Sequence, residues 1–180
     1  MKNHFALVLV AVALLFAVDA QAQHRVGPSY LYPDPAVTPG LANPAITQAN
    51  INETICNPSW STKSIRPPAS YTTLLKKKQL AAMKTKDKTP GHYEEDHFIS
   101  LELGGHPRDP KNLWPERWGT PANPLTAHGP FPSEIVGAKT KDKVENALHK
   151  AVCAGDLTLK EAQAIIATDW FKYYRDYVLK

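Results

Sequence analysis

The sequence predicts an α+β fold, a mainly helical domain built around one β-hairpin and held by a single disulfide bond. Three observations support this class. Residues 97–103 alternate between two kinds of side chain before two glycines, residues 138–154 place apolar side chains at helical spacing, and a helix-capping pattern begins at Thr158. The chain of 180 residues is long enough for one such domain with its own core.

Residues 1–22 have the pattern of a cleaved secretory signal peptide. Lys2 precedes a continuous apolar run from Phe5 to Val18, and Ala20 and Ala22 offer the small side chains that a signal peptidase reads. The run is too short to span a bilayer comfortably and no second one follows, so we expect no membrane anchor. The protein is therefore expected to be periplasmic or secreted.

Composition separates the rest of the chain into two parts. Residues 23–44 are rich in proline without periodicity, which predicts an extended or poorly ordered N-terminal arm. Residues 45–180 carry the periodic segments and are predicted to form the domain. The formal net charge of +4 permits a polyanionic partner without requiring one.

Two helices are expected before the hairpin. A short helix within residues 43–56 would deliver Cys56, and residues 71–88 combine good helix formers with apolar side chains for one face. A solvated helix face explains the lysines of this second segment about as well as a face turned toward phosphates.

The hairpin is expected to begin with a strand at residues 97–103. Ile99, Leu101 and Leu103 would form its buried face, and a turn would lead to a returning strand ended by Pro115. Residues 117–137 are loop-like, since proline and glycine occur throughout them.

Two further helices are predicted at the C-terminal end of the chain. The first covers residues 138–155 and stops at Gly155, and the second begins with the capping box of Thr158 and Glu161.

The two cysteines, Cys56 and Cys153, are predicted to form the disulfide. They lie far apart and lack the close Cys/His spacing of a zinc site. An even number of cysteines in an exported protein most simply forms a disulfide bond.

Asp96 and His97 are the residues whose side-chain types suggest metal binding and general-base catalysis. A carboxylate is a hard oxygen ligand that suits Mg²⁺ or a similar ion. A histidine with an ordinary pKa near 6.5 is largely neutral at neutral pH and can take a proton from water. Because neighbours on a strand point to opposite faces, the two side chains converge only where the strand bends or begins.

Several strings of the sequence resemble one family. "TICNPSW", "IRPP", "YEEDHFISLELGG", "DPKNLWPE", "KDKVENALHKAVCAG" and "LTLKEAQAIIATDW" occur in this order. They are similar to small exported bacterial proteins of the HNH endonuclease class, which carry a ββα-metal finger. The resemblance runs from about Ala45 to Tyr174 and implies an HNH-like ββα-metal nuclease domain over residues 45–180.

The resemblance implies roles for the residues of the hairpin. His97 resembles the general base, Asp96 the metal-binding residue before it, and Asn112 the residue that holds the hairpin and orients the base. Arg108 and Lys111, on the hairpin turn, are expected to contact phosphates.

The closing helix departs from the wider HNH pattern. "KTKDKVEN" stands where a histidine or asparagine ligand is usual, and the loop before it is longer than in a compact finger. Asp142 is our first candidate for the helix ligand, with Glu145 and Asn146 in reserve, and Lys141 is expected to contact phosphate.

The implied function is that of a metal-dependent, nonspecific endonuclease that hydrolyses phosphodiester bonds of DNA or RNA with Mg²⁺ or Mn²⁺. The alternative is a non-catalytic exported binding protein that keeps the hairpin as a scaffold. A secreted toxin, which would be matched by an immunity protein, is a third interpretation.

Overall fold

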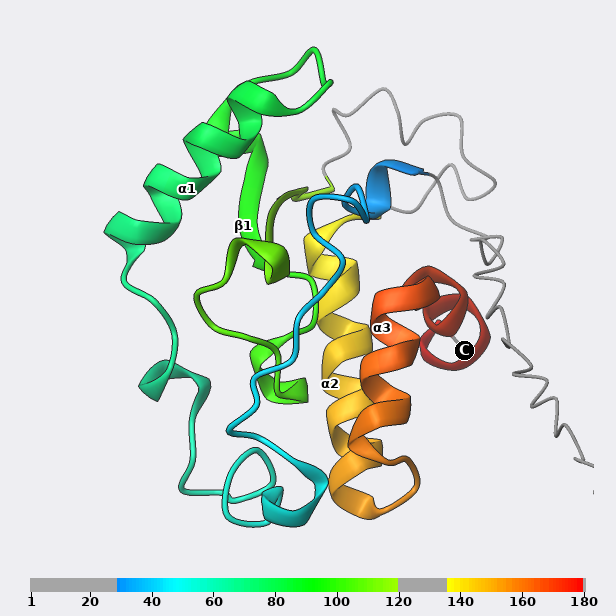
Figure 1. Ribbon diagram of the computed structural model, residues 1–180. Helices are drawn as coiled ribbons and strands as arrows, with labels where there is room; N and C mark the ends of the chain where they lie inside the picture. Colours follow the sequence, from blue (N-terminus) through cyan, green and yellow to red (C-terminus); the bar gives the residue numbers. More distant parts are fainter. Residues whose placement is uncertain (1–28, 120–135, 180) are drawn as a thin grey trace, which may run out of the picture.

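The computed structural model describes residues 29–119 and 136–179, which form a mixed helical and β structure. The predicted signal peptide lies outside these residues. The described helices are α1 (Ala69–Ala82), α2 (Ala138–Ala154) and α3 (Leu159–Tyr173), and the strands are β1 (Tyr93–His97) and β2 (Leu113–Arg117). The antiparallel hairpin lies between α1 on one side and the paired helices α2 and α3 on the other (Figure 1). The predicted α+β class is thus confirmed in this coarse form.

Helices α2 and α3 follow the local signals of the sequence. The Gly155 N–H donates to carbonyls of the last turn of α2, with the residue in the left-handed region at φ 85°. Thr158 and Glu161 form the predicted capping box at the start of α3. The two helices share a hydrophobic core, to which α2 gives Val144, Leu148 and Val152 and α3 gives Ala162, Ile166 and Trp170.

The first strand is shifted from its predicted position. It covers Tyr93–His97, whereas Leu101–Leu103 form a short 3₁₀ turn. Phe98 and Ser100 are as deeply buried as Ile99, so alternation here does not mark a strand with one solvent-facing side. The prediction of a strand over residues 97–103 was therefore wrong beyond its first residue.

Pro115 lies inside β2 instead of ending it. The Phe98 N–H donates to the Asn112 carbonyl, and ladder hydrogen bonds alternate along an antiparallel pair. Pro115, paired with Glu95, then occupies a position whose nitrogen points out of the ladder. Proline is tolerated there because no donor is needed.

The described part of the N-terminal arm packs against the domain. Leu31 and Tyr32 are buried in the core, and the Leu31 carbonyl accepts a hydrogen bond from the Trp170 indole at 3.2 Å. Ala42 forms a β-bridge with Gly105. The arm is extended in part but is continuous with the core. The short helix expected within residues 43–56 is limited to a 3₁₀ turn at Gln48–Asn50.

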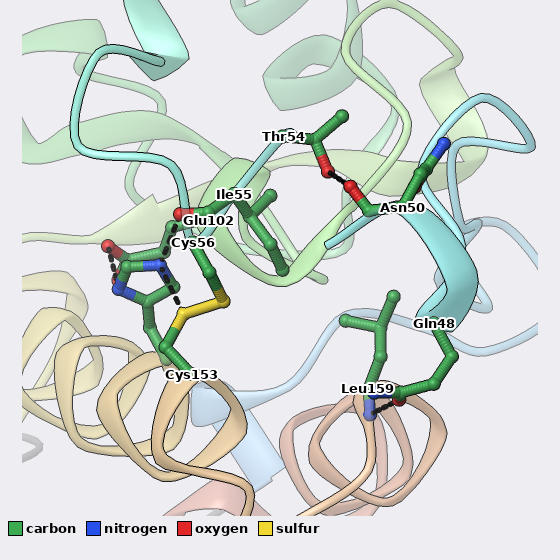
Figure 2. Close-up of a disulfide and its surroundings, with 9 residues drawn as sticks. Gln48, Asn50, Thr54, Ile55, Cys56, Glu102, Cys153 and Leu159 are labelled. Carbon is green, nitrogen blue, oxygen red and sulfur yellow. Dashed lines mark hydrogen bonds and ion pairs between the residues drawn. A yellow bond between two sulfur atoms is a disulfide. The ribbon is translucent and has the colours of Figure 1, made fainter. Parts of the chain in front are cut away.

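The predicted disulfide joins Cys56 to Cys153 and is confirmed. It ties the segment after the arm to the last turn of α2 (Figure 2). His149 lies beside it, with its Nε2 2.8 Å from the Ile55 carbonyl oxygen. A disulfide is consistent with a location outside the cytoplasm. None of the helices that the structure describes is long and apolar enough to cross a membrane.

Candidate functional site

His97 stands at the end of β1 with one ring nitrogen already engaged. Its Nε2 lies 2.9 Å from the Pro107 carbonyl oxygen, and since a carbonyl only accepts, this nitrogen carries the proton. The neutral ring therefore keeps its lone pair on Nδ1, to which no hydrogen bond is made by the part of the chain described here. Burial lowers the pKa of His97 below its ordinary value, so the imidazole is neutral at pH 7.

Asn112 holds the loop that carries this carbonyl. Its side chain is fully buried, and its Oδ1 accepts hydrogen bonds from the N–H groups of Ile99 and Leu41 at 2.9 and 3.2 Å. Its Nδ2 donates to the carbonyls of Ile99 and His106 at 2.9 and 3.0 Å. One amide thus ties the segment that follows His97 to the segment just before Pro107.

Gly105 allows this loop to close. A Cβ at this position would lie 1.8 Å from the Ile99 carbonyl oxygen and 2.8 Å from the Asn112 Nδ2. No side chain fits there, and the two backbones meet only because residue 105 is glycine.

Asp96 points to the opposite face of the hairpin, toward α2. Its Oδ2 lies 2.7 Å from the Nζ of Lys141, which also donates to the His97 carbonyl at 3.0 Å and to a carboxylate oxygen of Glu145. Lys141 has no exposed surface, so its ammonium reaches protein acceptors instead of the phosphate expected from the sequence. Burial opposes the charge, but the carboxylates of Asp96, Glu145 and Glu116 outweigh it and raise the pKa of Lys141 well above its ordinary value.

Two further carboxyl groups complete the buried cluster. Glu116 shares the Asp96 face of the hairpin and is 1% exposed, and burial raises its pKa well above the usual range. Burial also raises the pKa of Glu145 to about 8. For Asp96, burial is outweighed by Lys141, and the pKa is lowered. Burial therefore favours the protonated forms of Glu116 and Glu145, whereas Lys141 favours the ionised form of Asp96.

Two of the residues predicted to hold a metal ion, Asp96 and Glu145, meet at the ammonium of Lys141. Asp142 lies on the exposed side of α2. Among the histidine, cysteine, aspartate and glutamate side chains of residues 29–119 and 136–179, the sole set of three ligand atoms within 4.8 Å of one another belongs to Cys56, His149 and Cys153, whose sulfurs form the disulfide.

The ammonium also occupies the place of a cation on Asp96. Two unit charges 4 Å apart repel by about 4 kcal/mol at an effective dielectric constant of about 20, and a divalent ion beside Lys141 would be repelled about twice as strongly. Carboxylates are suitable Mg²⁺ and Mn²⁺ ligands by type, but the described arrangement at Asp96 does not fit such an ion.

Arg66 is a site residue that the sequence analysis did not single out. Its side chain is exposed. Burial lowers the pKa of His97 and raises the pKa of the nearby carboxyls Glu94, Glu102 and Asp142; the positive charge of Arg66 adds to the first shift and opposes the others. The string "IRPP" contained it, but nothing local in that string indicates which charged groups it would meet.

The two basic residues of the hairpin turn, Arg108 and Lys111, are also at the surface. Arg108 follows the Pro107 carbonyl that holds His97 and stacks 4.7 Å from the centroid of the Tyr71 ring. Lys111 is exposed, with its backbone N–H bonded to Asp109. Their phosphate contacts stay predictions.

The chain matches no protein-family model, and the searches of curated proteins and of solved structures found no match. The resemblance to HNH endonucleases therefore stays a prediction from the sequence motifs.

Glu95 provides a test of the electrostatics of the hairpin. Both of its carboxyl oxygens are buried and accept no hydrogen bond from the described residues, and burial raises its pKa to about 8 while Lys76 opposes the shift. The folded state therefore favours the protonated form, and the contribution of Glu95 to stability falls as the pH rises from 4.5 to 8.

We expect Glu95→Gln to remove this loss. The variant should be more stable than the wild type by on the order of 2 kcal/mol at pH 8, with little difference near pH 4.5; partial solvent access keeps the gain below that of the full shift. Urea unfolding across this pH range measures the difference, and Glu53→Gln, at an exposed position, is the control. A pH-independent difference would contradict the expected burial of a charge.

Proposed function

We propose that the protein is a phosphodiester hydrolase that cleaves nucleic acid without sequence specificity, with His97 as the general base. The observation that carries this proposal is the 2.9 Å contact of the His97 Nε2 with the Pro107 carbonyl oxygen, which is a hydrogen bond only when Nε2 carries the proton. With its proton held on Nε2 by the Pro107 carbonyl, the neutral ring presents Nδ1 as an acceptor, which is what the removal of a proton from water requires.

The proposed reaction is the in-line attack of water on phosphorus. The water oxygen forms a bond to phosphorus, its proton moves to Nδ1 of His97, and the bond from phosphorus to the leaving oxygen breaks, that oxygen taking a proton from solvent. Arg66, exposed and electrostatically coupled to His97, is the guanidinium proposed to contact the phosphate. Asn112 acts through the loop geometry, as a positioning residue.

In this proposal the protein binds nucleic acid through contacts to phosphates, which do not depend on the base sequence. Arg108 and Lys111 lie on the turn next to the histidine, and the chain has a formal net charge of +4. Because such contacts release counterions, we expect the affinity for DNA or RNA to fall steeply with salt. No step of this proposal passes through a divalent ion, since the described residues around Asp96 do not fit one.

The test uses a supercoiled plasmid and a single-stranded RNA as substrates. His97→Gln keeps a side-chain N–H for the Pro107 carbonyl but has no basic nitrogen, so we expect the cleavage rate to fall on the order of 100-fold or more with the fold retained. Wild-type cleavage should be level above about pH 7 and fall in acid, where the imidazole becomes protonated.

The matched control is His92→Ala. The His92 side chain is 62% exposed and pairs with Asp87, away from the Pro107 carbonyl, so this variant should cleave like the wild type. Equal rates for wild type and His97→Gln would contradict the proposal. They would favour the non-catalytic exported binding protein, which binds nucleic acid or another partner through the same hairpin.

A further inference from the structure

We propose that the ammonium of Lys141 takes the place of a divalent cation on Asp96, so that the hairpin site neither binds nor requires a metal ion at that carboxylate. The inference rests on the proposed function only where cleavage is measured. Its other measurement, metal binding, is independent of activity.

The position of Nζ is the first support. It lies 2.7 Å from the Asp96 Oδ2 and 3.0 Å from the His97 carbonyl oxygen, and it also bonds to Glu145. It therefore contacts a carboxylate of the hairpin, a backbone oxygen of the hairpin and a carboxylate of α2. Oxygen atoms from these same two elements would be the natural ligands of a bound ion.

The charges of the cluster are the second support. Lys141 forms ion pairs with both Asp96 and Glu145, the two carboxylates that meet at its Nζ. A divalent ion beside the ammonium would be repelled by it and would have to share these carboxylates with it.

Access from solvent is the third support. Lys141 is fully buried, and only a small part of the Asp96 side chain, 14%, is exposed. A cation that reaches Asp96 would have to displace the ammonium, and no solvent is available at Nζ to hydrate the displaced charge.

This arrangement makes Lys141 a positioning residue for His97. Its bonds to the Asp96 side chain and to the His97 backbone carbonyl attach α2 to the end of β1. The charge that holds the two elements together is thus covalently part of the chain, and chelators cannot remove it.

The first measurement is Mn²⁺ binding, followed by calorimetry and by thermal unfolding, on wild type, Asp96→Asn and Lys141→Met. We expect no Asp96-dependent Mn²⁺ binding in the wild type, so wild type and Asp96→Asn should respond alike. Lys141→Met replaces the ammonium by an apolar, unbranched side chain, and at millimolar Mn²⁺ its unfolding midpoint should rise by about 3 °C.

Two results would overturn the proposal. One is stoichiometric Mn²⁺ binding by the wild type that Asp96→Asn abolishes, and the other is a folded Lys141→Met variant that gains no stability from Mn²⁺. If Lys141→Met does not fold, the comparison of wild type with Asp96→Asn decides the question alone.

The second measurement is plasmid cleavage by the wild type after dialysis against EDTA. We expect a cleavage rate within twofold of that with Mg²⁺ or Mn²⁺ added. Cleavage that EDTA abolishes and Mn²⁺ restores would overturn the inference and leave the proposed function standing. No cleavage under any condition would overturn the proposed function, while the binding measurement still decides the role of Lys141.

Discussion

Replacement of Asn112 by alanine is expected to lower the free energy of unfolding by about 4 kcal/mol, because it leaves several buried backbone groups without partners, each at a cost of roughly 1–3 kcal/mol. The lost hydrogen bonds involve Ile99, through both its N–H and its carbonyl, and also Leu41 and His106. A domain of this size is stable by only about 5–15 kcal/mol, so the variant should unfold at much lower urea concentrations.

Asn146→Ala is the matched control for this measurement. The Asn146 side chain donates to the Asp142 carbonyl on the exposed surface of α2, where alanine is the better helix former. We expect the stability of this variant to change by less than about 0.5 kcal/mol. If Asn112→Ala changed the stability as little as Asn146→Ala does, the buried network could not be what holds the loop after His97.

The disulfide is expected to have an effect of similar size. Cys56 and Cys153 are separated by 97 positions, and closing a loop of that length restricts the unfolded chain by an amount worth about 4.7 kcal/mol in the chain-entropy model. We expect the double variant Cys56→Ser/Cys153→Ser to lose about that much in urea unfolding. The double variant avoids the free thiol that either single replacement would leave.

Reduction of the wild-type protein is the control for the serine substitutions. Wild type in excess dithiothreitol should unfold at the same urea concentration as the double variant, since both lack the cross-link. A loss below about 1 kcal/mol in both would contradict the expected restriction of the unfolded chain and indicate that it is already compact.

The elements that sequence reasoning located correctly are those governed by near neighbours. Gly155 ends α2, and Thr158 with Glu161 starts α3, through hydrogen bonds that span only a few residues. The Cys56–Cys153 pair followed from counting cysteines in a chain expected to be exported. Asp96, His97 and Asn112 were grouped from motif order; in the structure Asp96 and His97 are the last two residues of β1 and Asn112 directly precedes β2, but Asp96 and His97 point to opposite faces of the hairpin.

The predicted position of the first strand was wrong because an alternating sequence pattern only indicates which residues are buried. Burial itself depends on which other parts of the chain pack against the segment. Residues 98–101 are buried on all sides, and the Ile99 backbone bonds to the side chain of Asn112 instead of continuing the ladder. No pattern within those residues distinguishes this loop from a strand with one buried face.

Lys141 is the clearest example of a residue whose environment could not be predicted from its neighbours in the sequence. From its neighbours alone, a lysine early in a helix rich in charged residues is exposed and free to contact phosphate. Its acceptors Asp96 and His97 are more than forty positions earlier in the chain, and folding places them against the same turn of α2. Caps and glycine stops are determined by near neighbours in the chain, whereas the partner of a buried charge depends on which elements fold against each other, because electrostatic interactions depend on distance in space.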